Sequence, residues 1–114
     1  MEPFQFYEVI PASQYVTATV DMTAGQIATL AGTVSTAGIY GYPVHTDALT
    51  GERASLGLCG VATVKAGAAV SAGALLEVGS LGRVITRSAG VVVGRAITAA
   101  TAADQNLLMI IIPN

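Results

Sequence analysis

Several residue types that carry chemistry are scarce in this chain of 114 residues. It has no tryptophan, one cysteine (Cys59), one histidine (His45) and one lysine (Lys65). A single cysteine excludes a disulfide within the chain and fits a reducing cytoplasm. A metal site, or a nucleophile with its base, would therefore have to be built from very few side chains.

Charged residues are also scarce, with five basic and seven acidic side chains and a formal net charge of −2. This balance provides no basic surface to neutralise a phosphate backbone, so we expect no nucleic-acid partner. Hydrophobic residues make up 53% of the chain, which excludes intrinsic disorder for most of it. Because so little charge is available, we expect part of the folded surface to be covered in an oligomer or a larger assembly.

Long hydrophobic runs are absent. The longest strongly apolar run is Leu107–Ile112, whereas a membrane-spanning helix needs about 20 such residues. Residues 22–46 carry no formal charge, but glycines and polar residues interrupt them throughout. The acidic start, Met1–Glu2–Pro3, has no apolar segment of a secretory signal behind it. We therefore expect no membrane partner.

Catalytic and cofactor-binding patterns are missing as well. His45 and Asp47 have no third or fourth candidate metal ligand at a suitable spacing. Cys59 stands inside an apolar segment, where a small buried hydrophobic residue is the better interpretation than a nucleophile. The carboxylates are scattered singly, so no acid/base pair is visible. We predict a protein that is not an enzyme and needs neither cofactor nor metal.

What the sequence does contain is a series of short apolar segments separated by glycine, which predicts an all-β domain at residues 15–114. We expect it to be a small compact β-barrel, a β-clip-like fold or a sandwich. Glycines at 57 and 60 predict a bend or bulge inside one of the strands. The expected strands are 15–20, 26–34, 54–65, 75–78, 83–87, 91–98 and 107–112. Residues 79–82 are expected to form a hairpin turn between two of them.

Residues 1–14 are predicted to form an extended N-terminal arm. Half of the six aromatic residues lie in its first seven positions (Phe4, Phe6 and Tyr7), while Pro3 and Pro11 prevent a regular helix. An aromatic arm needs a surface, which is either its own domain or a neighbouring molecule.

One phrase in the body is similar to the strand-turn phrase of biotinyl and lipoyl carrier domains. Residues 67–76 spell G-x-x-V-x-x-G-x-x-L. Those carriers attach their cofactor to a lysine on the following hairpin, whereas the hairpin at residues 77–83 has none and Lys65 precedes the phrase. The phrase therefore indicates a β-turn geometry without the carrier function.

A second resemblance covers residues from about Thr17 to the end of the chain. The phrase Gly60–Val64 is followed by the glycine-bounded turn 67–73, the hairpin containing Gly82–Val84, the phrase Val93–Ala100 and a terminal apolar strand. This order and spacing resemble the capsid cement, or decoration, proteins of tailed bacteriophages.

The resemblance implies a β-rich protein without enzymatic activity that is synthesised in the cytoplasm of the bacterial host and binds the outer surface of the mature head. The implied partners are the major capsid protein and further copies of the same chain, because family members form oligomers, often trimers, that stabilise contacts between capsomers. Under this hypothesis Phe4, Phe6, Tyr7 and Tyr15 are the residues expected to bind the capsid or a partner, since buried aromatic side chains supply large contact areas.

Two alternatives stay open. One is another self-assembling β-structured component of the virion, in a tail or fibre. The other is a non-catalytic β-barrel that binds a small ligand. The number of chains per virion separates head decoration from the first alternative, and a monomeric mass favours the second.

Overall fold

The structure is a computed structural model that describes the backbone of residues 9–114 and the side chains from Ala12 onward. Its strands are β1 (Val9–Thr17), β2 (Ile27–Ala28), β3 (Tyr42–Pro43), β4 (Arg53–Lys65), β5 (Leu75–Val78), β6 (Val84–Thr86), β7 (Gly94–Ala96) and β8 (Asn106–Ile111). A short 3-10 segment (Ser80–Gly82) joins β5 to β6, and no α-helix occurs in the described residues. The predicted all-β class is confirmed.

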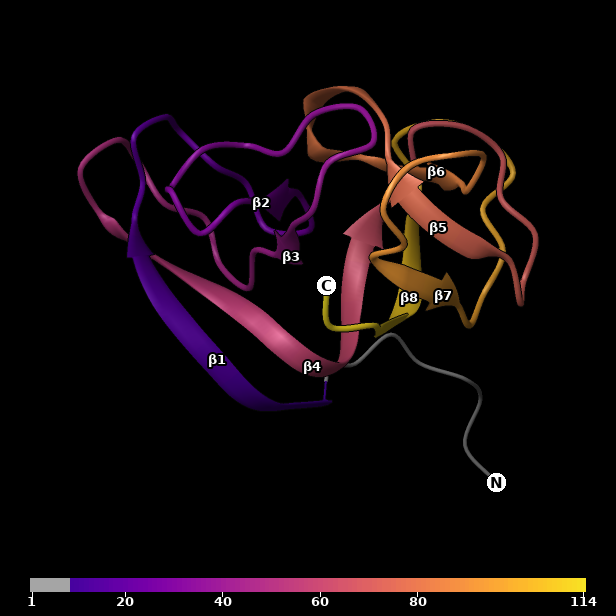
Figure 1. The fold of residues 1–114 in the computed structure, drawn as a ribbon, viewed down its shortest axis with the longest axis horizontal. Helices are drawn as coiled ribbons and strands as arrows, with labels where there is room; N and C mark the ends of the chain where they lie inside the picture. The colour runs from indigo at the N-terminus through magenta and orange to yellow at the C-terminus, as the bar shows by residue number, and fades with distance from the viewer. Residues whose placement is uncertain (1–8) are drawn as a thin grey trace.

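Six of the strands form one antiparallel sheet in the order β1-β4-β8-β7-β5-β6, and β2 pairs with β3 beside it (Figure 1). The end of the sheet curls back on itself, because Ala66, just after β4, forms a parallel bridge with Val84 of β6. The Gly67 N–H donates to the Val84 carbonyl at 2.7 Å beside this bridge. Strands β4, β8, β7, β5 and β6 therefore close into a small barrel, one of the three expected architectures.

Two separate hydrophobic cores hold the chain together. The barrel encloses the first, whose buried members include Ile27, Val64, Leu76, Val84, Leu107 and Met109. The second core lies between the first half of β4 and the β2–β3 pair, and its buried members include Met22, Ala28, Tyr42, Val44 and Leu56. Strands β4 and β2 both supply residues to the two cores, and β4, with 13 residues, is the longer connection between them.

Strand β4 bends at Gly60, which has a φ of 103°. Before the bend β4 pairs with β1, and from Gly60 onward it pairs with β8. The opposing strand β1 shows register shifts on both sides of Ala12, which is the irregularity expected of bulges. The bend predicted from the glycines at 57 and 60 is confirmed. Residues with a side chain rarely adopt this φ, so the glycine at position 60 allows β4 to bend and to pair with both β1 and β8.

The expected boundary between arm and body, at residues 14 and 15, falls inside strand β1. Pro11 does not interrupt the strand, because β1 is an edge strand, where a missing N–H is tolerated. Residues 9–14 are consequently part of the sheet and pair with β4 as far as Val61. Phe4, Phe6 and Tyr7 lie outside the described residues.

Most of the other expected strands are present. The segments 75–78 and 84–86 form the predicted hairpin, and the predicted strand 54–65 corresponds to β4. The terminal apolar run is β8, which lies between β4 and β7 and buries all but Asn106 and Ile110. Two predicted strands fall well short: the segment 26–34 contributes just the two residues of β2, and the segment 91–98 just the three residues of β7.

One carboxylate is used inside the fold. Glu77 of β5 is 7% exposed and accepts hydrogen bonds from the main-chain N–H groups of Ser88 and Ala89. The Ser88 hydrogen bond lowers the pKa of Glu77 the most; bonds from Gly90 and Ala89 and the charge of Arg87 lower it further, against the effect of desolvation. The carboxylate thereby holds the loop before β7 against β5.

We predict that Gly60→Ala lowers the free energy of unfolding by about 1–3 kcal/mol, because alanine is strained at a φ of 103°. Urea unfolding followed by circular dichroism measures the loss. Ser55→Ala, in the same strand at a position without positive φ, is the control and should be nearly neutral. An unchanged unfolding midpoint for Gly60→Ala would mean that the bend does not need glycine.

We also predict that Glu77→Gln is destabilising at pH 7 and much less so at pH 3. The folded pKa of Glu77 is lowered, so its stabilising effect is present above the unfolded pKa and is lost as the pH falls through the folded pKa. Unfolding free energies of both proteins at the two pH values measure this. Glu52→Gln is the control, since Glu52 is exposed and accepts a hydrogen bond from Leu49 N–H. A Glu77→Gln deficit that is equal at both pH values contradicts the prediction.

Candidate functional site

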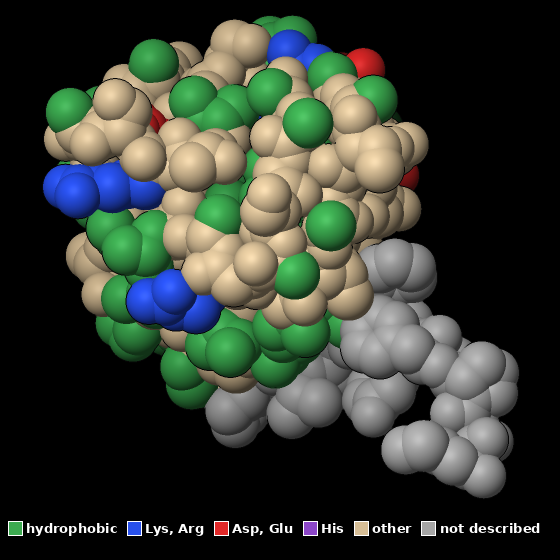
Figure 2. Space-filling view, turned by 90° about the vertical axis from the view of Figure 1, so that its right-hand side faces the viewer, with side chains coloured by type: hydrophobic (Ala, Val, Ile, Leu, Met, Phe, Trp, Pro, Cys, Tyr) green, Lys and Arg blue, Asp and Glu red, His purple; other side chains and the backbone are tan. Residues whose placement is uncertain are grey.

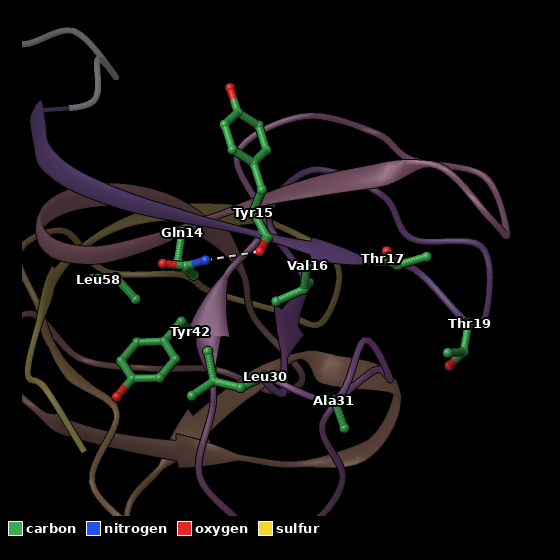
Figure 3. Close-up of a pocket in the computed structure, with 9 residues that line it drawn as sticks. All are labelled: Gln14, Tyr15, Val16, Thr17, Thr19, Leu30, Ala31, Tyr42 and Leu58. Atoms are coloured by element: carbon green, nitrogen blue, oxygen red, sulfur yellow. Dashed lines mark hydrogen bonds between the residues drawn. The ribbon is translucent and has the colours of Figure 1, made fainter.

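An open groove of about 700 Å³ lies beside β1. It lies between β1 and the loop that follows β2, and it backs onto the second core (Figure 3). The Tyr42 ring forms its floor, with the side chain of Leu30 next to it at the rim and Leu58 on the other side. The groove is lined by Gln14, Tyr15, Val16, Thr17, Thr19, Leu30, Ala31, Tyr42 and Leu58. No charged side chain belongs to this lining, so the groove suits an apolar or aromatic group.

Tyr15 contributes its backbone to the groove while its ring points the opposite way (Figure 3). Its side chain belongs to the outer face of the β1–β4 ribbon, where Tyr15 pairs with Ser55. The residue is 59% exposed, and the guanidinium carbon of Arg53 lies 5.7 Å from the ring centroid. Such a cation–π contact restricts an exposed aromatic ring and keeps it available for a partner.

The floor of the groove is fixed by the last residue of the chain. The Tyr42 hydroxyl donates to the main-chain oxygen of Asn114 at 2.6 Å. The Asn114 side chain accepts from Gly41 N–H at 3.0 Å and donates to the Gly41 carbonyl at 3.1 Å. These bonds tie the end of the chain to β3 and hold the Tyr42 ring in place beneath the opening.

The residues considered for catalysis lie apart from the groove lining. His45 is exposed, and its main-chain N–H donates to the Ser55 carbonyl at 2.8 Å. Asp47 is exposed and accepts a hydrogen bond from Ala24 N–H at 2.7 Å. His45 therefore ties the segment after β3 to β4, and Asp47 joins two loops. Cys59 is half-buried instead of buried as expected, because it lies opposite Ala12 in the outer β1–β4 ribbon.

The described residues contain no group of three or more His, Cys, Asp or Glu side chains that could hold a metal ion. Within the same residues, no helix is long and apolar enough to cross a membrane.

The surface carries few charges and many isolated apolar side chains. The face in Figure 2 is covered mainly by hydrophobic and uncharged atoms, with charged side chains near its borders. Apolar residues that are more than one-third exposed occur all over the molecule: Tyr15, Val20, Leu30, Ile39, Leu49, Leu81, Val91, Ile97 and Ile110. A surface of this kind is suited to protein contacts, because few charges must be desolvated when a partner binds.

The fold has a counterpart among phage structural domains. The solved structure of the head fibre gp8.5 N base in bacteriophage phi29 is similar, with a TM-score of 0.69 over 89% of this chain and 93% of that chain. The two sequences are 18% identical, so the likeness concerns the fold. No curated protein matches the chain.

The chain thus has the fold of a domain found in a phage head structure. A family model described as phage cement protein matches residues 11–111, which include both cores and the groove. The chain belongs to the phage cement protein family and is a structural component of the phage virion. The resemblance to phage cement proteins, which was based on the order and spacing of sequence phrases, is confirmed.

We predict that Asn114→Ala lowers the free energy of unfolding by about 1–3 kcal/mol, because the amide groups of Gly41 lose their side-chain partner. Chemical unfolding followed by tyrosine fluorescence measures the change. Asn106→Ala is the control, since the Asn106 side chain meets Lys65 only at 3.5 Å on the surface. Equal stability of the two variants would show that the end of the chain does not hold the groove floor.

Proposed function

We propose that this protein decorates the outer surface of the mature phage head and stabilises contacts between capsomers without catalysing a reaction. Its partners are the major capsid protein and other copies of the same chain. The observation that carries the proposal is membership of the cement family over residues 11–111. The low charge and scattered apolar side chains support it, because they favour extensive contacts with a protein shell.

Tyr15 is the described residue that we propose as a contact with the head. It combines high exposure with a ring restricted by Arg53, so little side-chain entropy is lost when it becomes buried. Each chain can contribute a small contact, because many linked copies on one shell bind together far more strongly than one.

A second candidate is the base of a fibre on the head. The similarity of the fold to the phi29 head fibre N base favours it. The two functions differ in copy number, since a decoration protein covers the shell and a fibre base occupies selected positions.

The experiment that tests the proposal is the count of this chain in purified virions by quantitative peptide mass spectrometry, relative to the major capsid protein. A count comparable with that of the major capsid protein supports decoration of the head. A few copies per virion would favour the fibre base, and absence from virions would contradict both.

We predict that Tyr15→Ser weakens binding to heads that lack this protein by tenfold or more, or about 1–2 kcal/mol, because a central aromatic contact is lost. Co-sedimentation with such heads at increasing protein concentration measures the change. Leu49→Ser is the control, because Leu49 is also largely exposed, at 62%, but lies outside the β1–β4 ribbon. Equal affinity of Tyr15→Ser and wild type would show that this face is not the contact.

A further inference from the structure

Strand β1 has an edge that can accept another strand. The Ser55 carbonyl of β4 accepts from His45, so the main-chain groups of Ser55 point away from β1. In an antiparallel pair, the main-chain groups of successive residues point alternately toward and away from the partner strand. The main-chain groups of Ala54 and Leu56 therefore point toward β1 and bond to those of Val16 and Gln14. The main-chain groups of Ser13 and Tyr15 consequently point to the open side of β1.

The side chain of Gln14 confirms this direction. Its Nε2 donates to the Tyr15 carbonyl at 3.1 Å, which places that carbonyl on the open edge (Figure 3). Further along, the loop after β2 covers the edge: Gly32 lies against the Thr17 carbonyl, and the Gly32 carbonyl accepts from Thr19 N–H at 2.9 Å. Gln14 already occupies the Tyr15 carbonyl, so the uncovered part of the edge is formed by the main-chain groups of Ser13 and the N–H of Tyr15, directly beside the groove.

The groove would receive the side chains of a strand added at this edge. Alternate residues of such a strand point to the same face as Gln14 and Val16, which line the groove. Those side chains would meet Leu30, which is 49% exposed at the rim, and the Tyr42 ring on the floor. The site therefore selects an extended segment with apolar or aromatic residues two positions apart.

The first eight residues of the chain have this composition. Phe4 and Phe6 are two positions apart, so they share one face whenever the segment is extended. The aromatic spacing of this segment therefore matches the groove.

An added strand from the same chain cannot bring Phe4 and Phe6 level with the groove residues of β1. Because β1 begins at Val9, the chain would have to turn back before that residue to pair with the edge. With the tightest two-residue turn, at residues 7–8, Phe6 would lie opposite Val9 and Phe4 opposite Pro11, short of Gln14 and Val16. A longer turn shifts both further from the groove, whereas a second copy of the chain has no such limit.

We propose that residues 1–8 of one copy add a strand to β1 of a second copy and place Phe4 and Phe6 in its groove. Phe4 and Phe6, which were expected to bind a partner, thus bind another copy of the same chain. A reciprocal exchange closes a dimer, and one-way donation around a ring closes a trimer. The inference deepens the oligomer named in the proposed function and does not require contact with the head.

The first test is the native mass of four proteins: the full chain, a chain lacking residues 1–8 so that β1 stays intact, Leu30→Glu and Leu49→Glu. We expect the full chain and Leu49→Glu to be oligomers, and the other two to be monomers at the same concentration. Leu49 is a matched control, because it is exposed and apolar but does not line the groove. A monomeric full chain, or an oligomeric Leu30→Glu, overturns the proposal.

A disulfide test covers the case in which Leu30→Glu fails to fold. In a Cys59→Ser background, an isotopically heavy chain carries Phe6→Cys and a light chain carries Leu30→Cys. We expect mild oxidation of the mixture to give a heavy–light disulfide, identified by peptide mass spectrometry. No such disulfide, or an intramolecular one in a single chain carrying both cysteines, overturns the proposal.

Binding to heads, measured on the same proteins, separates this inference from the proposed function. An oligomer that depends on residues 1–8 but does not bind heads contradicts the proposed function alone. A full-length monomer that binds heads contradicts the exchange alone.

Discussion

The bend of β4 at Gly60 is the constraint on which the rest of the structure depends. A strand of 13 residues is too long to belong to one small barrel, so its two halves have different partners. Ala62 and Val64, beyond the bend, enter the barrel core, whereas Ala54 and Leu56, before it, enter the second core. Without a positive φ at Gly60, the first half would continue in the direction of the barrel wall and could not cover the second core.

The same bend leaves β1 on the outside. Beyond Gly60 the barrel closes through β8 and β6, but the first half of β4 has only β1 on its outer side. An uncovered edge strand is a common site of unwanted association, and this chain restricts it with the Gln14 side chain and with the loop around Gly32. The short stretch that stays open adjoins the apolar groove, which is why edge and groove form one site.

The sequence predicted the elements whose signal is local. Strands β4, β5, β6 and β8 follow from apolar segments between glycines, and the bend follows from the glycines themselves. It did not predict the start of β1, because Pro11 is a strand breaker except at an edge, and edge position is a property of the whole sheet. The strands β2 and β3, with two residues each, exist only through their mutual pairing.

The groove could not be predicted for a related reason. Its lining comes from β1, β3, β4 and the loop after β2. Segments of this lining that are neighbours in space are far apart in the sequence. Leu30, Tyr42 and Leu58 carry no motif; only the tertiary fold and the bonds of Asn114 bring them together. Tyr15 was expected as a contact for its aromatic ring alone. The fold explains why that ring stays exposed, because alternation along β1 turns it outward while its neighbours Gln14 and Val16 turn toward the groove.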